Sequence, residues 1–139
     1  AKWWIIEIGT NNFGEIPYLS RIVQPTAGII TSVGESHLEF LKNTEGVAQE
    51  KSGLFVGIDP GKNIVIPDAI MHKEVFENAA RNYGLKLTKT VHILGELFLG
   101  KTKFKLFEKD FETNITSPLL IQNLVLALTI IWVWILLYL

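Results

Sequence analysis

Short apolar runs alternate with amphipathic segments along most of the chain. Three of these runs are typical of strands buried inside a sheet, and a fourth segment has a strand-like composition. They predict strands at residues 3–8, 27–31, 63–66 and 85–94. Between them, apolar positions recur at spacings of three and four and predict helices at residues 15–23, 44–55 and 70–83.

The order of these segments predicts the fold class. Strands that alternate with helices are typical of an α/β fold, in which helices flank a mostly parallel sheet. Thr44 is the expected N-cap of the second helix, and Gly84 is the expected C-terminal stop of the third. A further strand is expected at residues 103–107, where lysines alternate with apolar side chains and one face should meet water.

The end of the chain has a different character. Residues 124–139 contain no charged side chain and no Gly or Pro, so we expect a helix. One face of this helix should pack on the sheet, and the other should remain apolar and exposed. The run is shorter than the roughly 17–20 residues that span a bilayer, which favours a buried helix over a membrane anchor. A non-native tail is the third alternative.

Composition and charge narrow the function. The 139 residues are 48% hydrophobic, which is sufficient for one domain with a core of its own. A net charge of -1 excludes the broadly basic surface of a general nucleic-acid binder. The absence of cysteine excludes disulfides and thiolate metal sites.

Residues 95–102 match the phosphate-loop pattern G-x-x-x-x-G-K-[ST] letter for letter. The mechanism of that loop requires a helix directly after it, whose N-terminus faces the phosphates. Here the following residues alternate with a period of two, which indicates a strand, and the interior of the loop is Leu-Phe-Leu. The sequence therefore predicts an ordinary turn between strands.

Three side chains are candidates for chemistry at the edge of the sheet. Glu7 ends the first predicted strand and His37 follows the second, so both should lie at the carboxyl edge of a parallel sheet. Within roughly 10 Å of each other they could share a Mg²⁺ ion. The alternatives are a solvated strand-end Glu and a surface His. Lys51 lies on a helix whose inner face is otherwise apolar, so its side chain could point toward the sheet. The alternative is a lysine whose aliphatic part packs on the helix while its ammonium stays in water.

Three linked segments resemble the motifs of one family. Residues 7–16 are similar to an E-x-G-x-N-x-x-G-E-I motif, and residues 25–40 to P-x-x-x-x-I-T-N-V-G-x-x-H-L-E-x-F. Residues 45–55 are similar to E-G-V-A-x-x-K-x-x-[IL]-F. All three motifs, in this order, belong to the Mur ligases. The folate ligases that extend glutamate tails are related, but the G-E-I and H-L-E forms fit them less well.

The resemblance implies the central ATP-binding domain of an amide ligase, with a fold similar to the phosphate-loop NTPases. Such a ligase forms an acyl phosphate with ATP and Mg²⁺, and the forms above imply that it adds D-Ala-D-Ala to the UDP-MurNAc-tripeptide of peptidoglycan precursors. The resemblance also implies a cytoplasmic, mostly monomeric protein without a nucleic-acid partner. Residues 1–123 would be part of the central domain, and residues 124–139 an apolar terminal helix.

The resemblance implies a role for each matching residue. Glu7 and His37 would be Mg²⁺ ligands, and His37 and Lys51 would be catalytic, with Lys51 as a carbamylated lysine. Asn11 and Ser32 would bind substrate, and Asn123 would lie on the adenine side. The family's phosphate loop precedes the Glu7 segment and is not in this sequence, so we expect the chain alone to be inactive. The alternative is a non-catalytic binding or scaffold protein that reuses the Mur ligase core.

Overall fold

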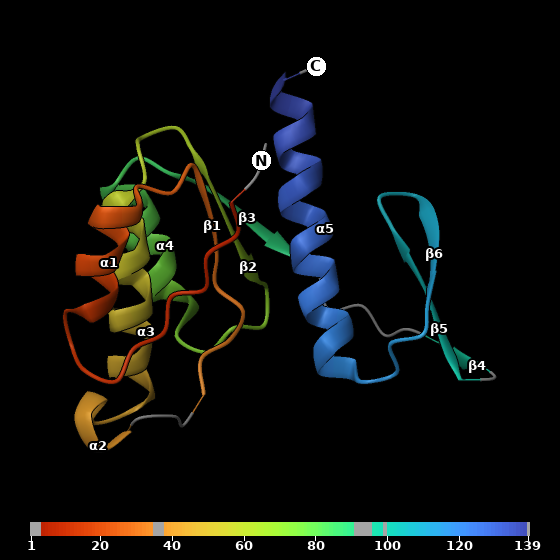
Figure 1. Ribbon diagram of the computed structural model, residues 1–139, viewed down its shortest axis with the longest axis horizontal. Helices are drawn as coiled ribbons and strands as arrows, with labels where there is room; N and C mark the ends of the chain where they lie inside the picture. Colours follow the sequence, from red (N-terminus) through yellow and green to blue (C-terminus); the bar gives the residue numbers. More distant parts are fainter. Residues whose placement is uncertain (1–3, 35–37, 91–95, 99, 139) are drawn as a thin grey trace.

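The computed structural model describes residues 4–34, 38–90, 96–98 and 100–138. Its elements form successive layers, which Figure 1 shows side on. A group of helices covers one face of a parallel sheet, a single long helix covers the other face, and a small antiparallel sheet packs on the far side of that helix. The expected α/β class, with helices on both faces of a parallel sheet, is confirmed.

The parallel sheet has the order β1-β2-β3, with β1 at Ala27–Ile29, β2 at Asn63–Pro67 and β3 at Lys86–Thr90. In the registers Ala27 pairs with Asn63, and Asn63 pairs with Lys86. The central strand β2 is buried from Asn63 to Ile66, as a strand covered on both faces must be. The continuous apolar run that predicted this strand is therefore consistent with its central position in the sheet.

Four helical elements and a 3-10 turn cover the first face. They are α1 (Glu15–Val23), α2 (Leu38–Leu41), α3 (Thr44–Ser52), η1 (Gly53–Gly57) and α4 (Lys73–Asn82). Phe55 and Phe76 are fully buried and pack 6.3 Å apart between their ring centroids, in one cluster with Ile64 and Ile66. This cluster is the main core, and it fixes the helices on the sheet.

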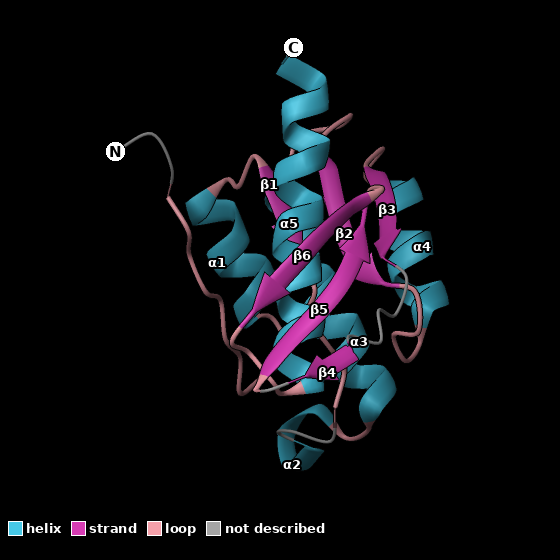
Figure 2. Cartoon of the chain, turned by 90° about the vertical axis from the view of Figure 1, so that its right-hand side faces the viewer, coloured by secondary structure: helices cyan, strands magenta, loops and turns pink. Residues whose placement is uncertain are grey.

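The second face is covered by α5 (Pro118–Tyr138), which Figure 2 shows behind a hairpin sheet. That sheet consists of β4 (Glu96–Phe98), β5 (Lys101–Leu106) and β6 (Lys109–Thr113), all antiparallel. Along β5 the lysines are exposed, whereas Phe104 and Leu106 are buried against Ile121 and Val125 of α5. The alternation predicted for residues 103–107 is confirmed, although the strand runs from Lys101 to Leu106.

The predicted strand at residues 3–8 is wrong over its described part. Residues 4–8 form no strand and lie outside the sheet on its β1 side. Trp4 and Ile6 are exposed, and Ile5 is 99% exposed. A strand needs a neighbouring backbone to receive its hydrogen bonds, and β1 ends the sheet among the described residues without pairing to this segment.

Two details of the helices also differ from the prediction. Asn43, rather than Thr44, caps α3, because its side-chain oxygen accepts a 2.8 Å hydrogen bond from the Gly46 N–H. The helix expected over residues 44–55 ends at Ser52 and continues as the 3-10 turn η1. Both Asn and Thr are favoured caps, so adjacent candidates cannot be ranked by residue type alone.

The terminal helix is confirmed, and it starts earlier than expected, at Pro118. The expectation that the outer face of residues 124–139 is exposed is wrong for Val125, because the small antiparallel sheet covers that side. Ile131 does remain exposed, as do Leu119 and Leu120 in the part of the helix that precedes the predicted range. Among the residues that the structure describes, no helix is long and apolar enough to cross a membrane.

Candidate functional site

A cavity of about 360 Å³ lies at the carboxyl ends of the three parallel strands. Its walls come from the segments that follow β1 and β2, from the last residue of β3, and from the first turn of α5. The polar lining residues are Thr31, Ser32, Asp68, Thr90 and Gln122. In open α/β sheets ligands bind at this edge, so the cavity is the candidate functional site.

One hydrogen bond joins two polar side chains of the cavity. The Gln122 amide Nε2 donates a 3.2 Å hydrogen bond to the hydroxyl of Thr90, which is itself buried. The other amide atom, Oε1, is buried and has no hydrogen-bond partner among the residues that the structure describes. A buried acceptor without a donor costs free energy, so this oxygen is suited to a ligand that carries an N–H group. Asp68, which also lines the cavity, pairs with Lys73 at 3.2 Å.

Lys51 contacts Ser32, which is one of the residues that line the cavity. The Lys51 ammonium donates a 2.6 Å hydrogen bond to the Ser32 backbone oxygen, so its side chain points to the sheet edge, as one of the two sequence alternatives expected. Burial lowers the pKa of Lys51, because desolvation disfavours the charged ammonium. More of this amine is therefore neutral near neutral pH than in an ordinary lysine.

Asn11 lies on a loop that the carboxylates of Glu15 and Glu50 hold in place. Glu15 accepts hydrogen bonds from the backbone N–H groups of Asn11, at 2.6 Å, and Asn12, at 3.1 Å. These bonds, together with one from the Asn12 side chain, lower the pKa of Glu15 to about 2. The side chain of Asn11 itself is exposed, which leaves its amide accessible beside the anchored backbone.

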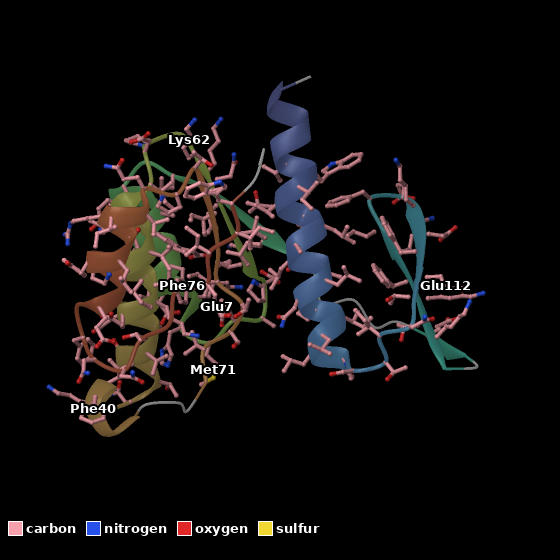
Figure 3. All side chains as sticks on the ribbon, in the orientation of Figure 1. Glu7, Phe40, Lys62, Met71, Phe76 and Glu112 are labelled. Atoms are coloured by element: carbon pink, nitrogen blue, oxygen red, sulfur yellow. The ribbon has the colours of Figure 1, made fainter. Side chains whose placement is uncertain are left out.

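The structure does not bring the remaining candidates into one described cluster. Glu7 is exposed, and Figure 3 labels it among the side chains near the sheet. His37 lies outside the described residues, so its distance from Glu7 stays a prediction. Asn123 is half-buried on α5, whereas its neighbour Gln122 lines the cavity. Across the described ranges, no group of three or more His, Asp or Glu side chains is arranged to hold a metal ion.

The phosphate-loop match forms a hairpin. Among its described residues, β4 pairs with β5 so that Phe98 lies opposite Lys101. Gly100 takes a positive φ of 75°, and β5 begins at Lys101 in place of a helix. The turn at Gly100 therefore leads into a strand and not into a helix, as predicted, although residues 96–98, which were expected in the turn, form β4.

The family model of the Mur ligase middle domain matches residues 1–131. The chain belongs to the Mur ligase family. The match includes the parallel sheet, the hairpin sheet and more than half of α5. The resemblance carried by residues 7–55 is therefore confirmed at the level of the family.

Several curated relatives of this Mur ligase middle domain carry one name, UDP-N-acetylmuramoyl-tripeptide--D-alanyl-D-alanine ligase. The protein of Buchnera aphidicola subsp. Baizongia pistaciae is 30% identical over 139 residues, which cover 93% of this chain and 30% of the relative. That of Haemophilus influenzae is 28% identical over 126 residues, 86% of this chain and 27% of the relative. The chain thus spans less than a third of these relatives.

Solved structures share the fold. A crystal structure of MurF from Acinetobacter baumannii superposes with a TM-score of 0.78 at 23% identity, over 88% of this chain and 29% of that one. A mutant of L. casei FPGS superposes with a TM-score of 0.70 at 15% identity, over 89% of this chain and 32% of that one. At these identities the likeness establishes the architecture alone.

Sequence reasoning missed several residues of the Mur ligase middle domain that the structure brings to the site. Asp68 and Thr90 could have been found by one rule, since each follows or ends a strand of the parallel sheet. Gln122 was not among the candidates, although its neighbour Asn123 was. No sequence signal indicated Glu50, a buried carboxylate on α3 whose partners lie more than thirty residues earlier in the chain.

Proposed function

We propose that this chain is the central part of an ATP-dependent ligase that adds D-Ala-D-Ala to the UDP-MurNAc-tripeptide. The observation that carries the proposal is the cavity at the carboxyl edge of the sheet, which is lined by Ser32, Asp68, Thr90 and Gln122. Lys51 holds the backbone of Ser32 through a hydrogen bond. The shared name of the curated relatives supports the choice of substrates. The enzyme would act in the cytoplasm and as a monomer.

In the proposed reaction, ATP phosphorylates the terminal carboxylate of the tripeptide. The amine of D-Ala-D-Ala then attacks the acyl phosphate, which releases phosphate and forms the amide bond. Mg²⁺ supplies positive charge that offsets the charge of the phosphates. Glu7 and His37 would hold this ion, and the exposed carboxylate of Glu7 offers the oxygen donor that Mg²⁺ prefers.

The first turn of α5 would receive the adenine. Within the described part of the chain no donor reaches the buried Oε1 of Gln122, and an exocyclic amine would supply one. Asn123 would lie on the same side of the nucleotide. Ser32 and Asn11 would contact the peptide substrate, each from a loop whose backbone another side chain anchors.

Lys51 would act as a carbamate. A neutral amine adds to CO₂ and loses a proton, so the side chain becomes an anion in place of a cation. The lowered pKa of Lys51 supports this role, because the reaction requires the deprotonated amine.

Titration of the ¹⁵N-labelled chain with Mg²⁺-ADP and with UDP-MurNAc-tripeptide tests the proposal. We expect amide shift changes around Ser32, Thr90 and Gln122, and weaker ADP binding in Gln122→Ala. Gln49→Ala, an exposed glutamine on α3, is the matched control and should bind as the wild type does. A chain that binds neither probe would contradict the proposal and favour a scaffold that reuses the Mur ligase core.

A further inference from the structure

Glu50 is a buried carboxylate that no proposed step uses. It lies in the last turns of α3, and only 4% of its surface is exposed. Burying a carboxylate is unfavourable unless hydrogen bonds and nearby positive charge compensate for the lost water. Its two oxygens therefore need strong partners, and those partners indicate what it does.

Both oxygens of Glu50 bind backbone N–H groups at the start of α1. Oε2 accepts from Gly14 at 2.8 Å, and Oε1 accepts from Ile16 at 2.7 Å. Gly14 is the N-cap of α1, its φ is 92°, and it has no side chain to cap the helix. Glu50, which lies on α3, thus caps the N-terminus of α1 in place of a side chain at Gly14. The positive end of the α1 dipole also favours the negative charge of Glu50.

The arrangement requires a carboxylate, because two N–H donors face two acceptor oxygens. A glutamine in this position has one acceptor and one NH₂ donor, so either Gly14 or Ile16 would face a second donor. An aspartate is one methylene shorter and would not reach. The identity of residue 50 is therefore specified by the loop that it binds.

The next residue, Lys51, binds the other loop of the candidate site. Successive helix residues are turned by about 100°, so Glu50 and Lys51 leave α3 in different directions. Glu50 holds the loop of residues 10–16, which contains Asn11, and Lys51 holds Ser32, after β1. One turn of α3 therefore sets the distance between the two loops that carry the candidate substrate residues.

We propose that Glu50 is a positioning residue, which fixes the Asn11 loop relative to Ser32 for substrate binding. The part of this inference that concerns substrate rests on the proposed function. The hydrogen bonds themselves do not depend on it, so the two can be tested separately.

The first test measures the hydrogen bonds in the folded wild-type chain. NMR couplings through the hydrogen bond should connect the Gly14 and Ile16 amide nitrogens to the Glu50 carboxyl carbon. This measurement needs no variant, so a variant that fails to fold does not affect it. Absence of both couplings would overturn the inference.

The second test compares Glu50→Gln with Glu45→Gln, which removes an exposed carboxylate from the same helix. Amide hydrogen exchange at Gly14 or Ile16 should accelerate at least tenfold in Glu50→Gln relative to Val65 in β2, and should not change in Glu45→Gln. Equal acceleration at Val65 would mean a loss of global stability alone, and would overturn a positioning role.

The third test titrates the same proteins with UDP-MurNAc-tripeptide. We expect Glu50→Gln to bind at least tenfold more weakly than the wild type, with Glu45→Gln unchanged. Equal affinity of Glu50→Gln and wild type would overturn the positioning role. If the wild type itself does not bind, the proposed function fails, and the couplings and exchange rates still decide whether Glu50 fixes the loop.

Discussion

The ammonium of Lys51 and the backbone oxygen of Ser32 lie 2.6 Å apart, which joins α3 to the loop that follows β1. A cation bound to a carbonyl oxygen remains protonated more readily, whereas burial favours the neutral amine. Burial prevails here, because the pKa of Lys51 lies below the ordinary value. The contact therefore positions an amine whose proton is weakly held.

The first prediction concerns the reactivity of this amine. In ¹³C-bicarbonate buffer near pH 8, Lys51 should form a carbamate more readily than ordinary lysines, since a larger fraction of it is deprotonated. A ¹³C NMR carbamate signal should be present in the wild type and absent in Lys51→Arg. Lys62→Arg, a change at another half-buried lysine, should retain the signal. A signal that persists in Lys51→Arg would assign the reaction to a different amine.

The second prediction concerns acid stability. The folded chain keeps Glu15 ionised down to a pKa of about 2, whereas the carboxyl takes up a proton near 4.5 when unfolded. The unfolded state therefore binds more protons in this window, and lowering the pH favours unfolding. The stabilisation is complete above pH 4.5 and is lost as the pH falls toward 2. Urea unfolding followed by circular dichroism at several pH values should show a smaller acid loss in Glu15→Gln.

Glu77 provides the control for that measurement. Its pKa is also lowered, mainly by its hydrogen bond from Lys89, so Glu77→Gln should reduce the acid dependence as well. The two changes should be additive, because the sites share no partner. An unchanged pH profile in Glu15→Gln would mean that its hydrogen bonds to the Asn11 loop do not persist in solution.

The third prediction compares two isoleucines on α5. Ile121 is 2% exposed and packs against β5, whereas Ile131 is 51% exposed. Ile121→Ala should lower the free energy of unfolding by about 2–5 kcal/mol, because it leaves a cavity between α5 and the hairpin sheet. Ile131→Ala should cost less than about 1 kcal/mol. Equal effects in urea unfolding would mean that the hairpin sheet does not cover α5.

The fourth prediction concerns the turn between β5 and β6. Phe107 and Glu108 both have positive φ, at 51° and 59°, where non-glycine residues are strained. The Phe107 ring stacks on Trp132 of α5, 5.0 Å away and nearly parallel. Glu108→Gly should stabilise the chain by about 1 kcal/mol, because glycine tolerates this conformation. Phe107→Ala should destabilise it by about 1 kcal/mol or more, since the stacking is lost.

The melting temperatures of the two variants test these opposite effects: Glu108→Gly should raise the melting temperature, and Phe107→Ala should lower it. Lys105 pairs with Glu108 at the surface, and such exposed pairs contribute little, so their loss should not mask the gain from glycine. A lower melting temperature for Glu108→Gly would show that the turn has a different backbone conformation.

The parts of the fold that depend on local pattern were predictable from the sequence. The helix Glu15–Val23 has the expected bounds, and the strand at Asn63–Pro67 differs by one residue, because each has a regular apolar pattern bounded by turn residues. The segment at residues 3–8 has an equally apolar pattern, but its described residues, 4–8, pair with no described strand. The hydrophobic pattern of a segment therefore indicates how apolar it is, but not whether another strand lies beside it to accept its hydrogen bonds.

Contacts in the candidate site could not be predicted from the sequence for the same reason, because they join residues on different elements. Lys51 and Ser32 were both candidates, yet their contact joins residues nineteen positions apart on different elements. The strand Lys109–Thr113 has no clear alternation and exists through its pairing with β5, so its own residues did not predict it. Glu50 resembles any polar residue of a surface helix until the loop that it binds is known.

The position of α5 between two sheets has a consequence for heating. The helix packs against the parallel sheet on one side, and contributes Ile121 and Val125 to the core that it shares with β5 on the other. The two sheets have separate hydrogen-bond ladders, but both pack against α5. If either sheet detached, the apolar face of α5 that it covers would be exposed to water. A scanning calorimeter should therefore record one heat-absorption peak rather than two, as for a molecule that melts in a single event.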